Sequence, residues 1–553
     1  MALRFRIAAI GALFVALTAA AQPDTVYHHA IVYTVDSDFR VAEAIAVRDG
    51  RILQVGSSAD LLKLAGPRTK IVDLGGKVVV PGLIDAHGHL LGLGQSLQTL
   101  NFVGTESLDA IIAMVSDGVS SASDGEWITG RGWDQNDWPD TTMPTHAALS
   151  ACSPDNPVML SRIGGHASFV NAAALTIAGI DRDTPDPPGG KILRDADGEA
   201  TGVLIDTAQS LVGKHVPAPT NSQIRDAIQA AIRHCLSVGL TGVHDAGVSP
   251  DLLNTYKLMI DEHAFDLRVY AMLRGSNPPR LRTEFERGPL IDYGGRLTVR
   301  CVKVVGDGAL GSRGAALLEP YSDDPGNSGL LIVDEERMIA LTEAALRAGF
   351  QVATHAIGDR ANHITLNAFE TAMNAVPEAD DPRLRIEHAQ IIALEDIPRF
   401  AALGVIPSMQ STHATSDFPW APIRLGDDRI PGAYAWRKLM DTGVRIANGS
   451  DFPVENANPF WGLYAAITRQ DHQGHPKDAW QPDQRMSRED ALRSFTIDAA
   501  YAAFEEGSKG SIETGKYADF VVVDRDIMNV PPTELLKTSV VMTILGGEVV
   551  YER

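Results

Sequence analysis

The stretch KVVVPGLIDAHGHLL, residues 77–91, decides the fold, because it turns from an apolar run into two histidines around one glycine. If the run is an extended strand, side chains alternate between its faces, so His87 and His89 point to one side and Gly88 to the other. Two neutral imidazoles that close together form half of a metal site. The short pattern is equally compatible with two solvated loop histidines, so the metal interpretation needs further ligands.

Residues of about 81–505 alternate short apolar strands with helical stretches such as DEERMIALTEAALRAG, 334–349. Strands that alternate with helices at this spacing lie parallel in one sheet, which predicts a (β/α) barrel or an open doubly wound sheet. The predicted strands lie within VVVPGLIDAH (78–87), LTGVHDAG (240–247), LRVYAML (267–273), LTVRCVKVVGDG (297–308), FQVATHAIGD (350–359), LRIEHAQ (384–390), GVIPSMQS (404–411) and GVRIANGSD (443–451).

Five of these strands end in side chains that bind metals or transfer protons. These side chains are His87 with His89, then Lys303, His355, His388 and Asp451. Taken singly, each histidine is more simply a structural residue, and the lysine could reach solvent past its strand end. In a (β/α) barrel the C-terminal strand ends meet at one mouth, so all of them would converge there. Their shared position therefore favours the barrel over the doubly wound sheet.

Both ends of the chain have a different sequence pattern, with short alternating strands broken by turns. Examples are AEAIAVRDGRILQVG (42–56) and SVVMTILGGEVVYER (539–553). We expect residues 22–80 and 506–553 to form one small β-sandwich beside the barrel, because the termini of a domain commonly lie close together. The stretch of about 95–235 is longer than one strand-to-helix step requires, which predicts an inserted subdomain over the barrel mouth.

Residues 1–21 have the layout of a secretory signal peptide. Arg4 and Arg6 precede an apolar run, and Ala19 and Ala21 form an Ala-x-Ala site before Gln22. The apolar run is too short to span a bilayer comfortably. We therefore expect a secreted, periplasmic protein that is free of the membrane after cleavage.

The composition argues against several classes of function. Lys and Arg number 48 against 70 Asp and Glu, a net charge of −22, so no basic face for nucleic-acid phosphates is expected. A small neutral or cationic substrate fits this balance better. The 3 cysteines are an odd number with wide spacing, which predicts neither a disulfide framework nor a cysteine zinc site. The oligomeric state stays open, with a homodimer among the options.

The motifs together resemble those of the metal-dependent amidohydrolase superfamily, and within it the amidohydrolase family 3 branch that includes N-substituted formamide deformylase. The resemblance extends over the mature chain. It rests on VVVPGLIDAHGH (78–89), GRGWDQNDW (130–138), GGHASFVNAAAL (164–175), VKVVGDGALGSRGAAL (302–317), THAIGDRA (354–361), RIEHAQ (385–390), NGSDFPV (448–454) and GSIETGKYADFVVVD (510–524). It implies an α/β fold, a (β/α)8 TIM barrel with a β-sandwich from both chain ends, and one or two divalent metal ions, usually zinc, at the mouth.

The resemblance also implies the ligand set. His87, His89 and Asp451 would hold one ion, His355 and His388 would hold a second, and Lys303 would bridge them after carbon dioxide carboxylates its amine. A free ammonium has no lone pair and repels a cation, whereas an N6-carboxylysine is an anionic oxygen ligand. If Lys303 stays unmodified, we expect a mononuclear site.

Such a metal centre predicts hydrolysis. Zinc with imidazole and carboxylate ligands and one open position lowers the pKa of bound water to about 7 and polarises a substrate carbonyl. We expect Asp451 to take the proton of that water and pass it to the leaving nitrogen. The predicted reaction cleaves the carbon–nitrogen bond of a small non-peptide amide, formamide or cyclic amide. The alternatives are an ester, carbamate or lactone hydrolase with the same site, and a non-catalytic periplasmic binding protein.

Five further residues are candidates for contact with the substrate. Trp133, Asp134 and His166 fall in the predicted insertion, where they could shape the pocket or pack the insertion itself. Arg313 follows the lysine strand and could bind a substrate anion or form a structural salt bridge. His413 follows the seventh strand and could line the mouth. The motifs name neither the substrate nor the physiological metal, since these ligands accept zinc, manganese or iron.

Overall fold

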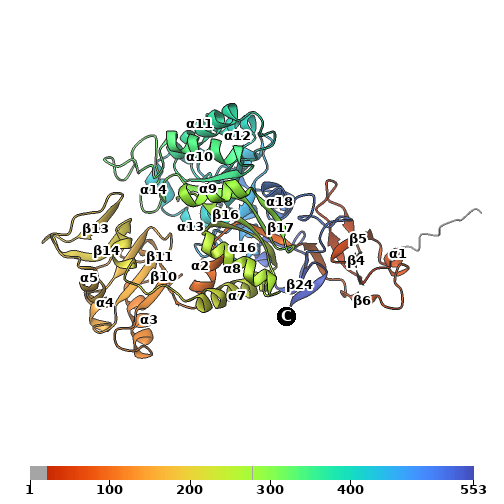
Figure 1. The fold of residues 1–553 in the computed structure, drawn as a ribbon, viewed down its shortest axis with the longest axis horizontal. Coiled ribbons are helices and arrows are strands. Elements are labelled where there is room, and N and C mark those ends of the chain that lie inside the picture. The colour runs from red at the N-terminus through yellow and green to blue at the C-terminus, as the bar shows by residue number, and fades with distance from the viewer. Residues whose placement is uncertain (1–21, 277) are drawn as a thin grey trace, which may run out of the picture.

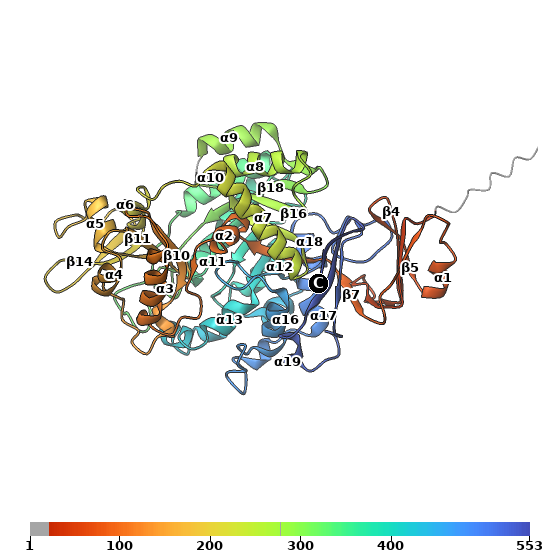
Figure 2. The same cartoon turned by 90° about the horizontal axis from the view of Figure 1, so that it is seen from below.

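The computed structural model describes residues 22–276 and 278–553, so the predicted signal peptide lies outside the described residues. Three units follow one another along the longest axis of the molecule, with an insertion at one end, a barrel in the centre and a β-sandwich at the other end (Figure 1). The perpendicular view in Figure 2 shows the same order. Within the described ranges, no helix is long and apolar enough to cross a membrane.

Eight parallel strands form a nearly closed barrel in the central unit, which confirms the predicted fold class. Five of them lie within the segments that the sequence predicts as strands, and β8, β15 and β16 each end one residue beyond the predicted segment. In sheet order they are β8 (Leu83–Gly88), β15 (Leu240–Val248), β16 (Arg268–Arg274), β18 (Leu297–Val305), β19 (Gln351–Ala356), β20 (Arg385–His388), β21 (Ile406–Gln410) and β22 (Ala447–Gly449). A ninth strand, β17 (Leu290–Tyr293), pairs antiparallel with β18.

The barrel closes between its last and first strands. The backbone nitrogen of Asp451 donates to the His87 carbonyl at 2.7 Å, and that of His89 donates to the Phe452 carbonyl at 2.8 Å. Gly449 lies at this seam, where an added Cβ would be 2.5 Å from Asp85 Oδ1. Only glycine therefore lets β22 approach β8 so closely. The seam places Asp451 beside His87 although the two are far apart in sequence.

Helices cover the outside of the barrel. Helix α7 (Asn221–Ser237) has an apolar stripe, which buries Ile228, Ile232 and Cys235 in the barrel core. The other helices of this unit are α2 (Leu90–Ser96), α8 (Pro250–Asp261), α9 (Pro278–Arg287), α10 (Glu335–Arg347), α11 (Asp359–Ala375), α12 (Ile397–Leu403), α13 (Ser411–Asp417), α14 (Ala421–Leu425), α15 (Trp436–Met440), α16 (Pro459–Thr468), α17 (Arg488–Ser494) and α18 (Ile497–Ala502).

The insertion is a six-stranded mixed sheet with short helices, and it is shorter than predicted. Its strands are β9 (Leu100–Asn101), β10 (Ile128–Trp133), β11 (Val158–Arg162), β12 (Ala167–Val170), β13 (Gly190–Arg194) and β14 (Ala200–Asp206), and its helices are α3 (Leu108–Ser120), α4 (Ala147–Cys152), α5 (Ala172–Ala178) and α6 (Gln209–Gly213). The expected boundary near 235 is wrong, because α7 packs its apolar face against the barrel.

Both chain ends build the β-sandwich. One sheet contains β5 (Arg51–Gly56), β4 (Ala44–Arg48), β1 (Thr25–His28) and β6 (Lys70–Asp73), with α1 (Ser58–Leu62) beside it. The other sheet contains β25 (Glu548–Glu552), β24 (Val540–Leu545), β23 (Phe520–Val523), β7 (Val78–Pro81), β2 (Ile31–Tyr33) and β3 (Val41–Ala42), and α19 (Pro532–Leu535) connects β23 to β24.

The central strands β7 and β23 are apolar throughout because both of their faces are covered. Val79 and Val522 point into the sandwich core. Val78 and Val521 point the other way into the core of the barrel. Alternation of side chains thus sends neighbouring residues into two different cores. The arrangement fixes the sandwich against the barrel.

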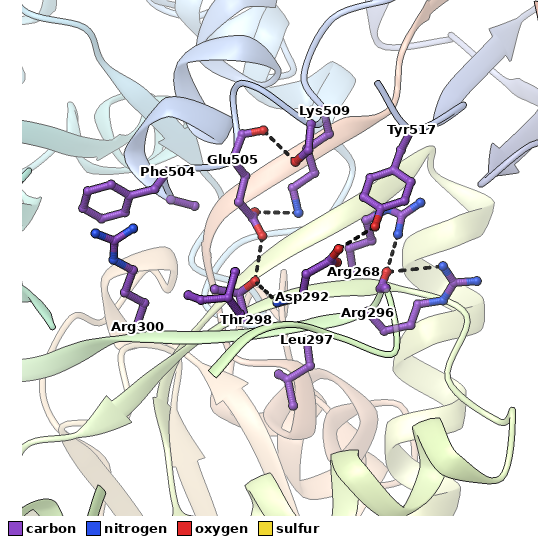
Figure 3. Close-up of a pocket in the computed structure, with 14 residues that line it drawn as sticks. Arg268, Asp292, Arg296, Leu297, Thr298, Arg300, Phe504, Glu505, Lys509 and Tyr517 are labelled. Carbon is purple, nitrogen blue, oxygen red and sulfur yellow. Dashed lines mark hydrogen bonds and ion pairs between the residues drawn. The ribbon is translucent and has the colours of Figure 1, made fainter. Parts of the chain in front are cut away.

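A cavity of 190 Å³ is lined by residues at the N-terminal starts of β16 and β18, at the opposite end of the barrel strands from the histidines. Figure 3 shows the side chains around this cavity. Several of its lining side chains have partners: Glu505 accepts from Lys509 and from Thr298, and Arg268 pairs with Asp519 outside the lining. This network joins the start of β16 and β18 to the segment that leads into the sandwich. We assign it a structural role.

Candidate metal centre

The C-terminal ends of the barrel strands bring the predicted chemical residues together. His87 is near the end of β8, Lys303 lies in β18, His355 in β19 and His388 at the end of β20. His89 directly follows β8, and Asp451 is the second residue after β22. All six line one cavity of 450 Å³. The convergence that the sequence predicts at one mouth is therefore present in the fold.

His87, His89 and Asp451 form a first group of potential ligands. The Nε2 atom of His89 lies 3.0 Å from Asp451 Oδ1, and that of His87 lies 3.6 Å from the same oxygen. Ligands about 2.0–2.2 Å from a tetrahedral ion lie roughly 3.4 Å apart. The spacing of these donor atoms fits a divalent cation.

Acceptors behind three of the rings hold them in the orientation that a metal requires. His87 Nδ1 hydrogen-bonds to Glu387, His89 Nδ1 to the Ala246 carbonyl at 2.9 Å, and His388 Nδ1 to Gln410 Oε1 at 2.8 Å. Carboxylate and carbonyl oxygens only accept hydrogen bonds, so each Nδ1 carries the proton. Each Nε2 then carries the lone pair with which an imidazole binds a metal.

The charge states of the side chains at the barrel mouth also favour the binding of a metal cation. Burial, together with the nearby Lys303 ammonium, lowers the pKa of His87 to about 4. Burial alone would raise the pKa of Asp451, but His87 and His89 hold it well below its usual range. At neutral pH the site therefore offers a neutral His87 imidazole and an anionic Asp451 carboxylate, and both groups are donors found in catalytic zinc sites.

Lys303 is fully enclosed by these groups. Its Nζ lies 3.2 Å from His87 Nε2, and burial lowers its pKa to about 8. With that pKa, roughly a tenth of the amines are uncharged at pH 7. An uncharged amine is the form that reacts with carbon dioxide, so the environment of Lys303 is compatible with the predicted carboxylation.

A second group consists of His388, His413 and Asp451. His355 belongs to neither group. Its ring packs against that of His388 with centroids 4.5 Å apart, but its Nε2 lies 3.4 Å from Asp307 Oδ1. Among the described residues, His355 Nε2, His413 Nε2 and Asp451 Oδ1 are buried without a hydrogen-bond partner. Such unpartnered atoms are expected where a metal ion binds.

Comparison with known proteins agrees with this geometry. A family model described as the amidohydrolase family matches residues 70–551. The chain belongs to the amidohydrolase family. This confirms the predicted enzyme class, a metal-dependent hydrolase that acts on carbon–nitrogen bonds other than peptide bonds.

Relatives match this amidohydrolase over nearly its whole length. YtcJ of Bacillus subtilis is 34% identical over 535 residues, which cover 96% of this chain and 99% of that protein. N-substituted formamide deformylase of Arthrobacter pascens is 29% identical over 549 residues, 96% of this chain and 98% of that protein. The crystal structure of an uncharacterized metal-dependent hydrolase from Pyrococcus horikoshii superposes with a TM-score of 0.75 at 28% identity, over 92% of this chain and 99% of that one.

The insertion of the amidohydrolase supplies one wall of the cavity. Asp134 and His166 line it, as does His413 from the barrel, so the structure places these three predicted substrate residues at the mouth. Asp134 forms an ion pair with Arg162, and His166 Nδ1 lies 2.9 Å from Asp206 Oδ1. Both side chains are therefore held in place by the insertion's own sheet.

Two predicted substrate residues do not reach the amidohydrolase cavity. Trp133 is fully buried, and its indole nitrogen donates to the Leu160 carbonyl at 2.8 Å. It points into the insertion core because alternation along β10 directs it away from the mouth. Arg313 pairs with Asp323 at 2.8 Å, so the structural salt bridge holds and anion binding by Arg313 is not supported.

The sequence did not predict the residues that support the metal ligands. Glu387 is fully buried between His87 and Arg385, whose Nε lies 2.8 Å from Glu387 Oε1. The signal was present in RIEH, since two charged residues in a buried strand need partners. Asp417 also lines the cavity. It accepts a hydrogen bond from Tyr434, and burial raises its pKa to about 7.

Proposed function

We propose that this amidohydrolase hydrolyses the carbon–nitrogen bond of a small non-peptide amide, with N-substituted formamides as the first substrate class. The observation that carries the proposal is the group of His87, His89 and Asp451 at the barrel mouth, with its neutral His87 imidazole and anionic Asp451 carboxylate. A divalent cation bound by such a group, which we propose to be zinc, acidifies water and polarises a carbonyl oxygen.

Asp451 is the proposed proton carrier. Its Oδ1 is buried without a hydrogen-bond partner in the described part of the chain, and its low pKa keeps it ionised at neutral pH. It can accept a proton from the attacking water and deliver it to the amide nitrogen, because an amine leaves only after protonation.

Lys303 is the proposed bridging ligand after carboxylation. As an ammonium beside His87 it would repel a cation, and its pKa of about 8 leaves an uncharged fraction that can react with carbon dioxide. The carbamate would replace a positive charge by a negative one inside the ligand cluster. Metal binding would then favour the carboxylated state of Lys303.

The cavity supports a small substrate with an apolar part. Its volume of 450 Å³ is in the range of small-molecule sites. Leu310, Ile357 and Trp420 line it on the barrel side, and Val103 lines it on the insertion side. The relative from Arthrobacter pascens is named N-substituted formamide deformylase, which supports starting with formamides that carry an apolar N-substituent.

The test is hydrolysis by the zinc-loaded protein. We expect release of formate and amine from an N-alkylformamide, and loss of release after chelation. An ethyl ester and a lactone of similar size serve as comparison substrates. Cleavage of these oxygen compounds without any amide cleavage would replace the proposal by an esterase, and saturable binding without any product would indicate a binding protein.

We also propose that the protein is exported to the periplasm, since residues 1–21 have the layout of a signal peptide. Cell fractionation and N-terminal sequencing test this. A mature chain that begins at Gln22 in the periplasmic fraction is the expected result, and an intact N-terminus in the cytoplasm would contradict it.

A further inference from the structure

His166 is held at the wall of the metal cavity by the local structure of the insertion. It follows the turn between β11 and β12, which closes with a hydrogen bond from the Gly165 nitrogen to the Arg162 carbonyl at 2.9 Å. Gly165 has a φ of 73°, which glycine adopts readily because it has no Cβ. Ala167 and Phe169 pack in the insertion core, so alternation along β12 places His166 on the opposite face. There it lines the same cavity as the barrel histidines.

Asp206 holds the ring of His166 from behind. It is the last residue of β14, which pairs antiparallel with β12. Its backbone nitrogen donates to the His166 carbonyl at 2.9 Å, and its Oδ1 lies 2.9 Å from His166 Nδ1. Asp206 has a φ of 46°, a left-handed conformation that is uncommon outside glycine and persists only where the surrounding structure imposes it. Two hydrogen bonds between the same two residues thus fix both the position and the rotation of the imidazole.

Asp206 also decides which nitrogen of His166 carries the proton. A carboxylate only accepts hydrogen bonds, so Nδ1 is the donor, and in the neutral imidazole Nε2 is an acceptor. In the part of the chain that the structure describes, no group forms a hydrogen bond with this Nε2. The acidic side chains on the same wall are arranged differently, since Asp134 pairs with Arg162 and Asp137 is exposed. His166 therefore offers an acceptor to a molecule bound in the cavity.

A secondary amide presents opposite groups to the two walls of this cavity. The metal ligands come from the barrel and His166 comes from the insertion, so a substrate at the metal centre lies between them. The carbonyl and the N–H of a planar trans amide point in opposite directions. When the carbonyl oxygen faces the metal ligands, as the proposed function requires, the N–H points towards the insertion. A carbonyl oxygen has no hydrogen to donate, so the N–H is the group that the neutral imidazole of His166 can bind.

We propose that His166 determines specificity by accepting a hydrogen bond from the N–H of the scissile amide, so that the site selects secondary amides over tertiary ones. A tertiary amide carries a carbon in place of this hydrogen and leaves His166 Nε2 without a partner. Asp206 is a positioning residue that acts through His166. The inference rests on the proposed function and narrows its substrate class to amides with a single N-substituent.

The test compares N-butylformamide with N-butyl-N-methylformamide as substrates of the zinc-loaded protein. We expect the wild type to prefer the secondary amide. In His166→Ala, kcat/KM for the secondary amide should fall roughly 5- to 100-fold, the range for a buried donor that loses its acceptor, while kcat/KM for the tertiary amide should change little. Asp206→Ala should reduce the same preference. His146→Ala is the matched control, because His146 belongs to the insertion, bonds to Ser150 and does not line the cavity.

The ratio of the two kcat/KM values separates this role from a structural one, because damage to the insertion would slow both substrates alike. His166→Gln keeps an acceptor oxygen and should retain part of the preference, which keeps the test valid if the alanine variant does not fold. An unchanged ratio in both His166 variants, or a wild type without preference, would overturn the inference. If neither amide is hydrolysed, the proposed function fails, and calorimetric binding of the same pair decides the inference. Tighter binding of the secondary amide that is lost in His166→Ala would support it, and equal affinities or no binding would overturn it.

Discussion

Replacement of Glu387 by glutamine should weaken both the barrel core and the metal site. Glu387 accepts from His87 with one oxygen and lies 2.8 Å from Arg385 Nε with the other. A glutamine amide has only one oxygen, so its NH₂ group must face either the guanidinium or His87 Nδ1. In the first case the amide NH₂ and the guanidinium are both donors, so they cannot hydrogen-bond to each other. In the second, the imidazole proton moves to Nε2 and the lone pair for the metal is lost.

The structure sets the size of both effects. Glu387 and Arg385 are fully buried, and removing one partner from a buried ion pair costs about 3–5 kcal/mol. The remaining guanidinium donors keep the Ala86 carbonyl and Ser408, at 2.8 and 2.9 Å, so no further group loses its partner. Loss of the group that orients a histidine ligand typically weakens metal binding about 10–100-fold.

Urea unfolding of the metal-free protein measures the first effect, and zinc competition with a chelator measures the second. Glu395→Gln is the matched control, because Glu395 is exposed and should change the free energy of unfolding by less than about 0.5 kcal/mol. A Glu387→Gln protein within about 1 kcal/mol of the wild type, well below the ~3–5 kcal/mol expected, would refute the account of the buried pair. Unchanged zinc affinity would refute the account of the tautomer.

Three other predictions concern different parts of the molecule. Burial alone would raise the pKa of Asp519, but the Arg268 guanidinium lowers it in the folded protein. The ion pair therefore stabilises the fold above the pKa of an unfolded aspartate, about 3.9. This stabilisation is lost as the pH falls through the lower pKa of Asp519 in the folded protein. Urea midpoints of wild type and Asp519→Asn should therefore differ at pH 7 and converge towards pH 3; a constant difference would contradict this. Trp133→Ala should cost about 3–5 kcal/mol in the insertion core, seen as faster hydrogen exchange there, with metal content unchanged. Zinc at 1,000 times its dissociation constant should add about 4.1 kcal/mol to the free energy of unfolding, so chelation should lower the melting temperature. Equal melting temperatures with and without a chelator would count against a metal that binds the folded state.

The barrel could be predicted because each of its strands carries a local signal. The eight apolar segments alternate with helices, and the first ends in His87 and His89, so both the order of strands and the position of the mouth follow from the sequence. The boundary of the insertion could not be predicted in the same way. The apolar stripe of α7 has the same period whether it packs on the insertion or on the barrel.

Some features of the site could be predicted from the sequence and others could not. A histidine at a strand end can be placed at the mouth, but the direction of its nitrogen depends on partners from other strands. His355 faces Asp307, and His413 faces Asp451, through contacts that no local pattern contains. The sequence could not decide whether Trp133 lines the pocket or packs the insertion, because the phase of β10 relative to the cavity depends on how the insertion docks.

The sandwich has a consequence for the order in which the protein can fold. Strand β7 lies between β2, made early, and β23, which the ribosome makes only after the whole barrel. At about 5–20 residues per second the delay is tens of seconds. During that time β7 has an unpaired edge and an apolar face without cover, which is a surface that invites aggregation. The β-sandwich, whose first strands emerge earliest during synthesis, therefore cannot be completed until the last strands of the chain are made.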